Sequence, residues 1–171
     1  SSSARAPVRG ITASLHALIV KIGLDVDAGV VNTMLDAYAK GGGRDLPAAR
    51  KVFDTMEKDV VSWNTMIALY AQNGLSAEAL ELYGKMLNVG GGIRYNAVTF
   101  SAVLLACAHA GTIQTGKRIH NQVVRMGLEE NTYVGTSVVD MYSKCGRVEM
   151  ARKAFGKIKE KNVLSWSAMI T

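Results

Sequence analysis

Two cysteines and three histidines are the residues of this chain best suited to bind a metal or act as nucleophiles. Cys107 and Cys145 stand alone, without the CxxC spacing that zinc sites and redox motifs use. Isolated cysteines in apolar stretches indicate a reduced compartment and buried, structural thiols. His16 and His120 fall at equivalent places of a repeated pattern and cannot cluster, and His109 is expected in a turn or at the surface. The sequence therefore predicts no catalytic residue, no metal site and no cofactor.

Small polar side chains form a second group of candidates. Four of them stand just before expected helices, within three residues of the first helical position: Asp59, Asn96, Asn131 and Asn162. Aspartate and asparagine are preferred N-caps, because their side-chain oxygens accept hydrogen bonds from the free N–H groups of the first turn. Capping alone can therefore explain them. Asn32, Asn64 and Thr136 lie inside expected helices, where these residue types have poor propensity, so capping does not explain them.

The elements that position these residues follow from an internal repeat. The segment DVVSWNTMI at Asp59–Ile67 returns as NVLSWSAMI at Asn162–Ile170, with a constant offset of 103 residues. Trp63 and Trp166, the two tryptophans of the chain, obey this offset and are expected to be packing residues. Self-similarity at a fixed period indicates a repeat array.

Apolar residues spaced three and four apart predict a series of short helices, most of which end at glycine. The expected helices are Ile11–Ile22, Val30–Lys40, Leu46–Met56, Val60–Gln72, Ser76–Asn88, Val98–Ala110, Thr112–Met126, Val134–Lys144, Val148–Lys159 and one beginning at Val163. Asn-Gly, Ala-Gly and Cys-Gly mark the middle turn of successive helix pairs, because glycine readily takes the left-handed conformation that ends a helix.

These helix pairs divide the chain into units at 1–27, 28–59, 60–96, 97–131, 132–162 and 163–171. The four complete units are 32, 37, 35 and 31 residues long. A hairpin of this length cannot bury its own apolar face, so successive hairpins must stack around one shared core. The predicted fold is an all-α, right-handed α-solenoid of stacked helix-turn-helix hairpins, forming a single domain with a concave groove.

Composition agrees with such a domain. The chain has 171 residues, of which 49% are hydrophobic, and no segment is long and apolar enough to span a membrane. A formal net charge of +6 and a pI near 9.4 fit an anionic partner, but they also fit an ordinary solvated surface. Residues 1–8 contain Ser, Ala and Arg but no acid, a composition that suits the end of a transit peptide, although the repeat pattern already holds from Ile11.

Three longer segments carry a family resemblance: VVSWNTMIALYAQNGLSAEALELYGKM, LLACAHAGTIQTGKRIHNQVVRMGL and VVDMYSKCGRVEMARKAF. They resemble the P, long and short motifs of plant pentatricopeptide repeat (PPR) proteins of the PLS class. The resemblance implies short-type motifs at 28–59 and 132–162, a P-type motif at 60–96 and a long-type motif at 97–131. Residues 1–27 then match the second helix of a long-type motif, and residues 163–171 match the first helix of a P-type motif.

The resemblance further implies sequence-specific binding of single-stranded RNA, rather than DNA, in a mitochondrion or chloroplast, with one base per motif. In the family, the fifth and the last residue of each motif recognise the base. These pairs are Asn32 with Asp59, Asn64 with Asn96, Ser101 with Asn131, and Thr136 with Asn162. The residue that packs against the base is Val61, Val98 and Leu164 at three motifs, whereas Gly29 and Tyr133 depart from this pattern. The implied base order from the N-terminus is U, C or U, A, A.

Alternatives remain beside RNA binding. Helical hairpins of this size also occur in tetratricopeptide-repeat scaffolds, whose grooves bind peptides, so a protein-protein interaction scaffold stays open. The HxE and PCxxC strings of the deaminase that some PLS proteins carry are absent from these 171 residues, and no enzymatic activity is expected. The segment is expected to belong to a longer array, with editing or processing proteins as partners and uncapped ends that could self-associate.

Overall fold

A computed structural model describes Gly29, Thr33, residues 46–89 and residues 94–170. Within these residues the chain forms eight α-helices and no strand. The helices are α3 (Leu46–Thr55), α4 (Val60–Gln72), α5 (Ser76–Asn88), α6 (Ala97–Ala110), α7 (Ile113–Arg125), α8 (Thr132–Lys144), α9 (Val148–Lys157) and α10 (Val163–Ile170). Each lies where the apolar spacing predicts a helix. The two helices predicted before residue 41 fall almost wholly outside the described residues.

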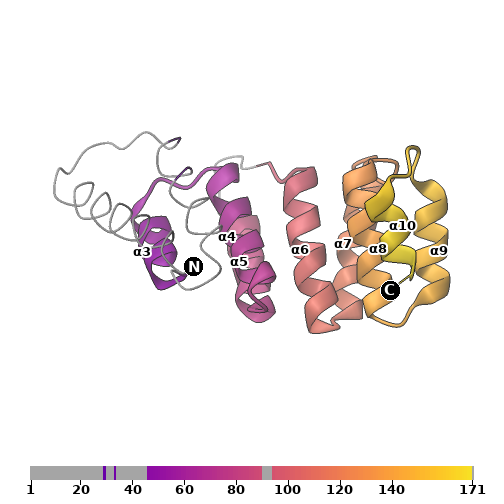
Figure 1. Cartoon of the computed structure of the whole chain (residues 1–171). Coiled ribbons are helices and arrows are strands. Elements are labelled where there is room, and N and C mark those ends of the chain that lie inside the picture. Colours follow the sequence, from indigo (N-terminus) through magenta and orange to yellow (C-terminus); the bar gives the residue numbers. More distant parts are fainter. Residues whose placement is uncertain (1–28, 30–32, 34–45, 90–93, 171) are drawn as a thin grey trace, which may run out of the picture.

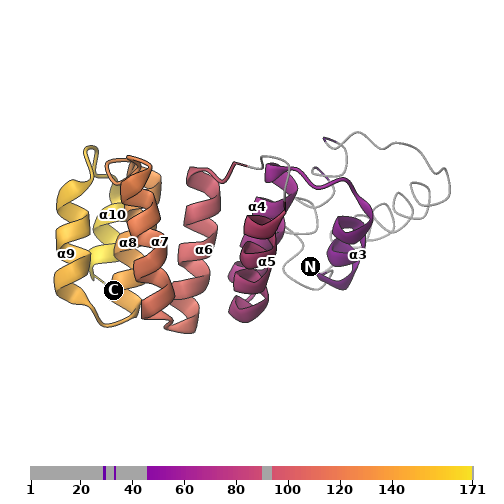
Figure 2. The same cartoon turned by 180° about the vertical axis from the view of Figure 1, so that it is seen from behind.

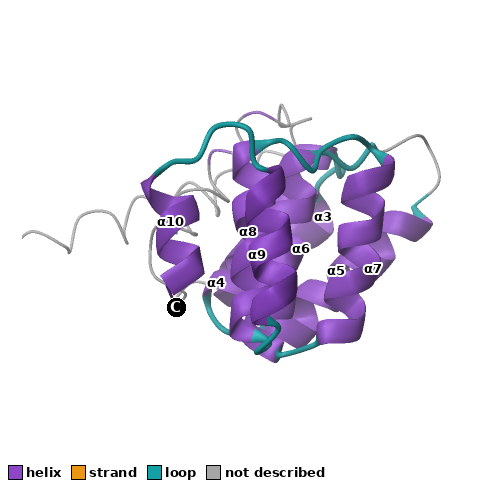
Figure 3. Cartoon of the chain, turned by 90° about the vertical axis from the view of Figure 1, so that its right-hand side faces the viewer, coloured by secondary structure: helices purple, strands orange, loops and turns teal. Residues whose placement is uncertain are grey.

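The helices form a row of antiparallel hairpins. Helix α4 pairs with α5, α6 with α7, and α8 with α9, while the first helices α4, α6, α8 and α10 pack against one another in sequence. The second helices lie on the other side of the row, as the opposite views in Figures 1 and 2 show for α5 and α7. Figure 3, viewed from the α9 and α10 end, places α10 on one side and α5 and α7 on the other. Packing therefore runs from each hairpin to the next, and the predicted all-α solenoid is confirmed.

Glycines end the first helices as predicted. Gly111 is the C-cap of α6 at a φ of 63°, and Gly74 and Gly146 follow α4 and α8 at φ of 76° and 68°. This left-handed backbone carries no steric penalty at glycine, which lets the chain reverse sharply into the second helix. The Ala-Gly, Asn-Gly and Cys-Gly dipeptides thus fix the hairpin turns.

One continuous core runs through the described helices. Its fully buried side chains include Phe53 of α3, Phe100 of α6 and Tyr142 of α8. Trp63 is 3% exposed and meets Phe53 edge-on, with ring centroids 4.9 Å apart. The equivalent Trp166 makes the same contact with Phe155 but is 56% exposed, because no described helix follows α10. Both tryptophans pack as predicted, to a degree set by their neighbours.

Two helical glycines offer a matched test of this packing. An added Cβ at Gly116 of α7 would overlap the side chain of Met141 in α8, which is fully buried, whereas a Cβ at Gly84 of α5 would meet no atom within 4 Å. We expect Gly116→Ala to lower the free energy of unfolding by about 1 to 3 kcal/mol through overpacking. Gly84→Ala should instead raise it by about 0.5 to 1 kcal/mol through helix propensity. Urea denaturation followed by circular dichroism measures both, and equal effects would contradict the packing described for α7 and α8.

Candidate nucleic-acid interface

The four polar residues that precede first helices are N-caps in the structure. Asp59 Oδ1 accepts a hydrogen bond from the Ser62 amide at 2.7 Å, and Asn162 Oδ1 accepts one from the Ser165 amide at 2.9 Å. Asn96 Oδ1 accepts from the amides of Val98 and Thr99, and Asn131 Oδ1 accepts from those of Tyr133 and Val134. Capping therefore holds at all four positions, and each cap places its side chain at the start of a first helix.

Asn64 and Asn96, the predicted pair of the second unit, are in contact although 31 residues separate them. Asn64 Nδ2 donates a hydrogen bond to Asn96 Oδ1 at 3.2 Å. Asn64 is 5% exposed, and its own Oδ1 is buried without a hydrogen-bond partner among the described residues. A buried amide oxygen that lacks a partner is costly and uncommon, which marks this position as one that could receive a ligand donor.

Ser101 and Thr136 occupy the same place on α6 and α8 as Asn64 does on α4. Ser101 is 6% exposed, and its Oγ is also buried without a partner in the described part of the chain. Thr136 is half-buried, and its Oγ1 donates to the Thr132 carbonyl at 2.7 Å. Because α4, α6 and α8 pack side by side, the three residues lie in register along the row. Asn32, the fourth predicted member, lies outside the described residues.

Apolar side chains are exposed at the second position of each described first helix. The exposed fractions are 50% for Val61, 48% for Val98, 59% for Tyr133 and 68% for Leu164. Gly29, the equivalent residue of the first unit, is also exposed. These side chains lie two residues after the caps, in the first helical turn, and each offers an exposed apolar group that a flat base could cover.

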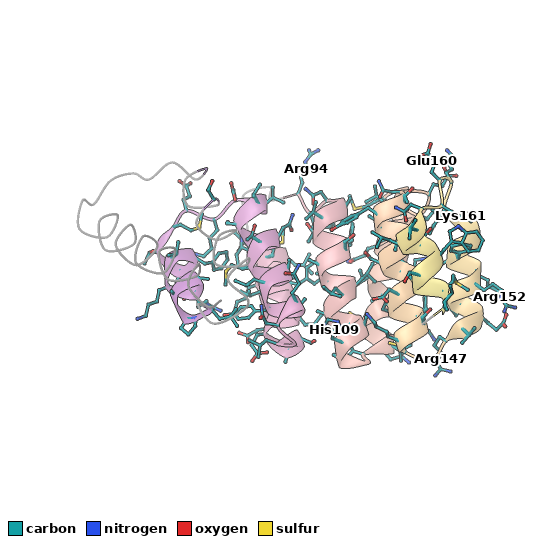
Figure 4. All side chains as sticks on the ribbon, viewed as in Figure 1. Arg94, His109, Arg147, Arg152, Glu160 and Lys161 are labelled. Carbon is teal, nitrogen blue, oxygen red and sulfur yellow. The ribbon has the colours of Figure 1, made fainter. Side chains whose placement is uncertain are left out.

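Basic side chains border three of the four caps. Lys58 directly precedes Asp59, and its Nζ lies 5.2 Å from the ring centroid of Phe53. Lys161 directly precedes Asn162, and its Nζ lies 5.3 Å from the ring centroid of Phe155. Figure 4 shows Arg94 and Lys161 at the edge of the row where α6 and α10 begin, opposite the edge with His109 and Arg147. At the remaining junction, Glu129 and Glu130 form ion pairs with Lys157 and Lys159. Positive charge thus lies beside the caps at three junctions.

The cysteines and histidines have structural surroundings. Burial raises the pKa of the Cys107 thiol to about 11 and also raises the pKa of Cys145, so both thiols stay protonated at neutral pH. Burial lowers the pKa of His120, whose Nδ1 lies 3.0 Å from the Tyr142 hydroxyl oxygen. His109 Nδ1 lies 2.9 Å from the Ala71 carbonyl oxygen, and His16 falls outside the described residues. In the described ranges, no three His, Cys, Asp or Glu side chains are grouped so that they could hold a metal ion.

A row of helical hairpins around one core, with polar residues repeated at fixed positions, defines an α-solenoid repeat protein. None of its described helices is long and apolar enough to cross a membrane. The PPR repeat family model matches residues 58–109, and the PPR repeat model matches residues 136–163. The chain thus contains repeats of the pentatricopeptide repeat family.

Several plant proteins resemble the chain. A mitochondrial pentatricopeptide repeat-containing protein of Arabidopsis thaliana is 51% identical over 99% of the chain, which spans 26% of that relative. The mitochondrial protein OGR1 of Oryza sativa subsp. japonica is 39% identical over 99% of the chain, which spans 30% of it. The crystal structure of the pentatricopeptide repeat protein PPR10 from maize aligns with a TM-score of 0.62 at 20% identity, covering 96% of the chain and 25% of PPR10. The chain thus spans about a quarter of the length of these proteins.

Sequence reasoning did not assign the hydroxyls three residues after the caps. Ser62, Thr99 and Ser165 are fully buried and accept hydrogen bonds from the cap amides of Asp59, Asn96 and Asn162 at 2.9 to 3.0 Å. A cap residue followed three positions later by a polar side chain is the signature of a capping box. That spacing was present in the sequence and would have identified these hydroxyls.

Proposed function

We propose that the chain binds single-stranded RNA, with one base recognised at each pair of a first-helix polar residue and the following cap. The contact between Asn64 and Asn96 carries the proposal, because it brings together two side chains that share one motif and leaves a buried amide oxygen without a partner. Single-stranded RNA can present its bases splayed out, with their Watson–Crick edges toward side chains. The exposed apolar residues beside the caps would cover the base faces, and the basic residues would contact the phosphates.

The second unit illustrates how such a pair would act on a base. Asn96 Oδ1 is occupied by the amides of Val98 and Thr99 and by Asn64, so its NH₂ group remains to donate. Asn64 Nδ2 is occupied by Asn96, so its Oδ1 remains to accept. Cytosine and uracil both place a donor next to an acceptor on their Watson–Crick edges, in opposite order. The pair can therefore meet either pyrimidine, and since the same donor and acceptor also match adenine, the preference for C or U is proposed from the family resemblance.

The fourth unit offers a different arrangement. Thr136 Oγ1 uses its hydrogen on the Thr132 carbonyl and can only accept from a base, while Asn162 Oδ1 is used by the Ser165 amide. An acceptor beside an NH₂ donor complements the amino group and N1 of adenine. The first unit ends in Asp59, whose carboxylate offers only acceptors, which supports uracil through its N3–H. We propose the order U, C or U, A, A from the 5′ end.

The wider setting is proposed from the relatives. Their names place them in mitochondria or chloroplasts, as for a chloroplastic Arabidopsis thaliana protein that is 40% identical over 91% of the chain, which spans 19% of it. We propose an organellar protein of the PLS class in which this segment positions a transcript for editing or processing. Partner proteins for those steps would bind elsewhere in the longer array.

Binding by the 171-residue chain should be weak and sensitive to salt. Stacking is worth about 1 to 3 kcal/mol per base, and association and strand ordering oppose it, so we expect a Kd of about 1 μM or weaker. The logarithm of affinity should fall with the logarithm of salt concentration, with a slope of about −0.7 per phosphate contact. Fluorescence anisotropy with a labelled RNA containing UCAA, and with the same DNA sequence, measures both properties.

A pair of alanine variants separates this interface from the rest of the surface. Asn64→Ala should weaken RNA binding, whereas Asn121→Ala, an exposed residue of α7, should leave it unchanged. Nanomolar binding that ignores salt, or equal affinity for RNA and DNA, would contradict the proposal. Binding of peptides but not RNA would favour a scaffold instead.

A further inference from the structure

We propose that the buried hydroxyls of Ser62, Thr99 and Ser165 are positioning residues for base recognition, which rests on the proposed RNA binding. All three are fully buried and already hydrogen bonded to their caps, so they offer no free group to a base, unlike the unpartnered Oδ1 of Asn64. Each instead holds the backbone of a cap residue that is predicted to contact a base. They would therefore set how sharply the neighbouring base is distinguished, not whether RNA binds.

The hydrogen bonds give a mechanism for this positioning. Thr99 Oγ1 accepts from the Asn96 backbone amide at 3.0 Å and lies 3.3 Å from Asn96 Oδ1, to which it can donate. The Thr99 amide donates to the same Oδ1 at 3.2 Å. An asparagine amide with two nearly equal ends can rotate by half a turn and exchange its donor for its acceptor. Four donors surround Oδ1: the amides of Val98 and Thr99, Thr99 Oγ1 and Asn64 Nδ2. Together they oppose that exchange, so the NH₂ group faces outward.

The serine boxes hold their caps in a similar way. Ser62 Oγ donates to the Asp59 carbonyl at 2.9 Å and accepts from the Asp59 amide at 3.0 Å. Ser165 Oγ makes the same two bonds with Asn162, at 2.8 Å and 2.9 Å. Each cap is thus fixed through both its backbone and its side chain, which keeps its position constant relative to the first helix that it begins.

The junction before α8 lacks this device. The residue three positions after Asn131 is Val134, which is fully buried and has no hydroxyl. Asn131 Oδ1 accepts from the amides of Tyr133 and Val134, but no side chain returns a bond to the Asn131 amide, which donates to the Leu128 carbonyl at 3.1 Å. Three caps have a described partner in the preceding first helix: Asn96, Asn131 and Asn162. Of the three bases that these pairs would recognise, the third base, at Asn131, is therefore expected to be recognised least selectively.

Two substitutions between valine and threonine test the inference with little change in side-chain volume. Thr99→Val removes the hydroxyl after Asn96, and Val134→Thr adds one after Asn131. We expect Thr99→Val to reduce the ratio of affinities for pyrimidine over purine at the second base by about fivefold, the equivalent of one lost cap hydrogen bond. The affinity ratios at the other bases should not change. Thr99→Ser, which keeps the hydroxyl, should retain the original affinity ratio at the second base. Val134→Thr should raise the selectivity at the third base. Anisotropy titrations with RNAs that differ at one base measure each ratio.

A readout without RNA separates this inference from the proposed function. The side-chain NH₂ signals of Asn96 in an NMR spectrum should be well separated in the unmodified chain and should move together in Thr99→Val. If Thr99→Val lowers the melting temperature but changes neither these signals nor the second-base ratio, the hydroxyl is only a helix cap. If Thr99→Val does not fold, Val134→Thr provides the test. An affinity ratio at the third base that is unchanged in Val134→Thr overturns the inference. Absence of any base preference in the unmodified chain, with the NMR effect intact, would overturn the proposed function alone.

Discussion

Replacing Thr136 by Asn together with Asn162 by Asp is expected to move the preferred fourth base from adenine to uracil. The double variant recreates the pair of Asn32 and Asp59 in the first unit. In the proposed arrangement Thr136 would accept from the base and Asn162 would donate to it, whereas the new carboxylate only accepts and so disfavours the acceptor N1 of adenine. A well-placed pair discriminates between bases by about 1 to 3 kcal/mol, a change of roughly 5- to 150-fold in relative affinity. Titration with RNAs that differ at the fourth base measures the change.

The control for this experiment introduces the same residue types at positions outside the predicted base-reading pair. Ser137→Asn with Asn121→Asp introduces the same residue types and the same change in charge, on α8 beside Thr136 and on α7. Its base preference should remain that of the unmodified chain. If the Thr136 and Asn162 variant also keeps the original preference, these two residues are a helix residue and a cap without a part in recognition.

Phe100→Ala should destabilise the array more than any other change considered. Phe100 is fully buried in α6, between the hairpins on either side, and its ring meets Tyr95 edge-on at 5.7 Å. Truncating a buried phenylalanine to alanine costs about 3 to 5 kcal/mol, because apolar contacts are lost and a cavity remains. Since each hairpin of a repeat array is stabilised by its neighbours, loss of packing at α6 should also separate the unfolding of the two halves.

Leu87→Ala provides the matched control on α5, where the leucine is 43% exposed. An exposed side chain has few contacts to lose, and we expect a change within about 0.5 kcal/mol. Urea denaturation followed by circular dichroism compares the two variants. A Phe100→Ala protein as stable as Leu87→Ala would show that the hairpins do not depend on a shared core.

The helices were predictable because their signals are local. Apolar residues at spacings of three and four predicted the bounds of α4 and α5, and the glycines after α4, α6 and α8 have the left-handed backbone that the turns require. The two tryptophans show where local signals stop. Trp63 and Trp166 have similar neighbours in sequence, yet one is 3% exposed and the other 56%, because burial depends on which helices pack around them.

The candidate site was predictable as a set of positions but not as a geometry. The motif positions named Asn64 and Asn96, and the structure adds that they are hydrogen bonded and that Asn64 is almost fully buried. A contact between residues so far apart in sequence depends on how α4 and α6 stack. No spacing rule gives it. Burial is a second feature that the positions alone do not give, because Asn64 and Ser101 lie between first helices, while the caps Asn96 and Asn131 are exposed beside them.

The packing of each hairpin on the next also determines how the row responds to force. Elements joined in sequence through similar interfaces act as springs in series, so a small change of angle at every junction adds up to a large change in overall length. No single hairpin must deform for the row to lengthen or shorten. A strand whose nucleotides are spaced differently from the hairpins could therefore be matched by a small change of angle at every junction instead of a large deformation at one.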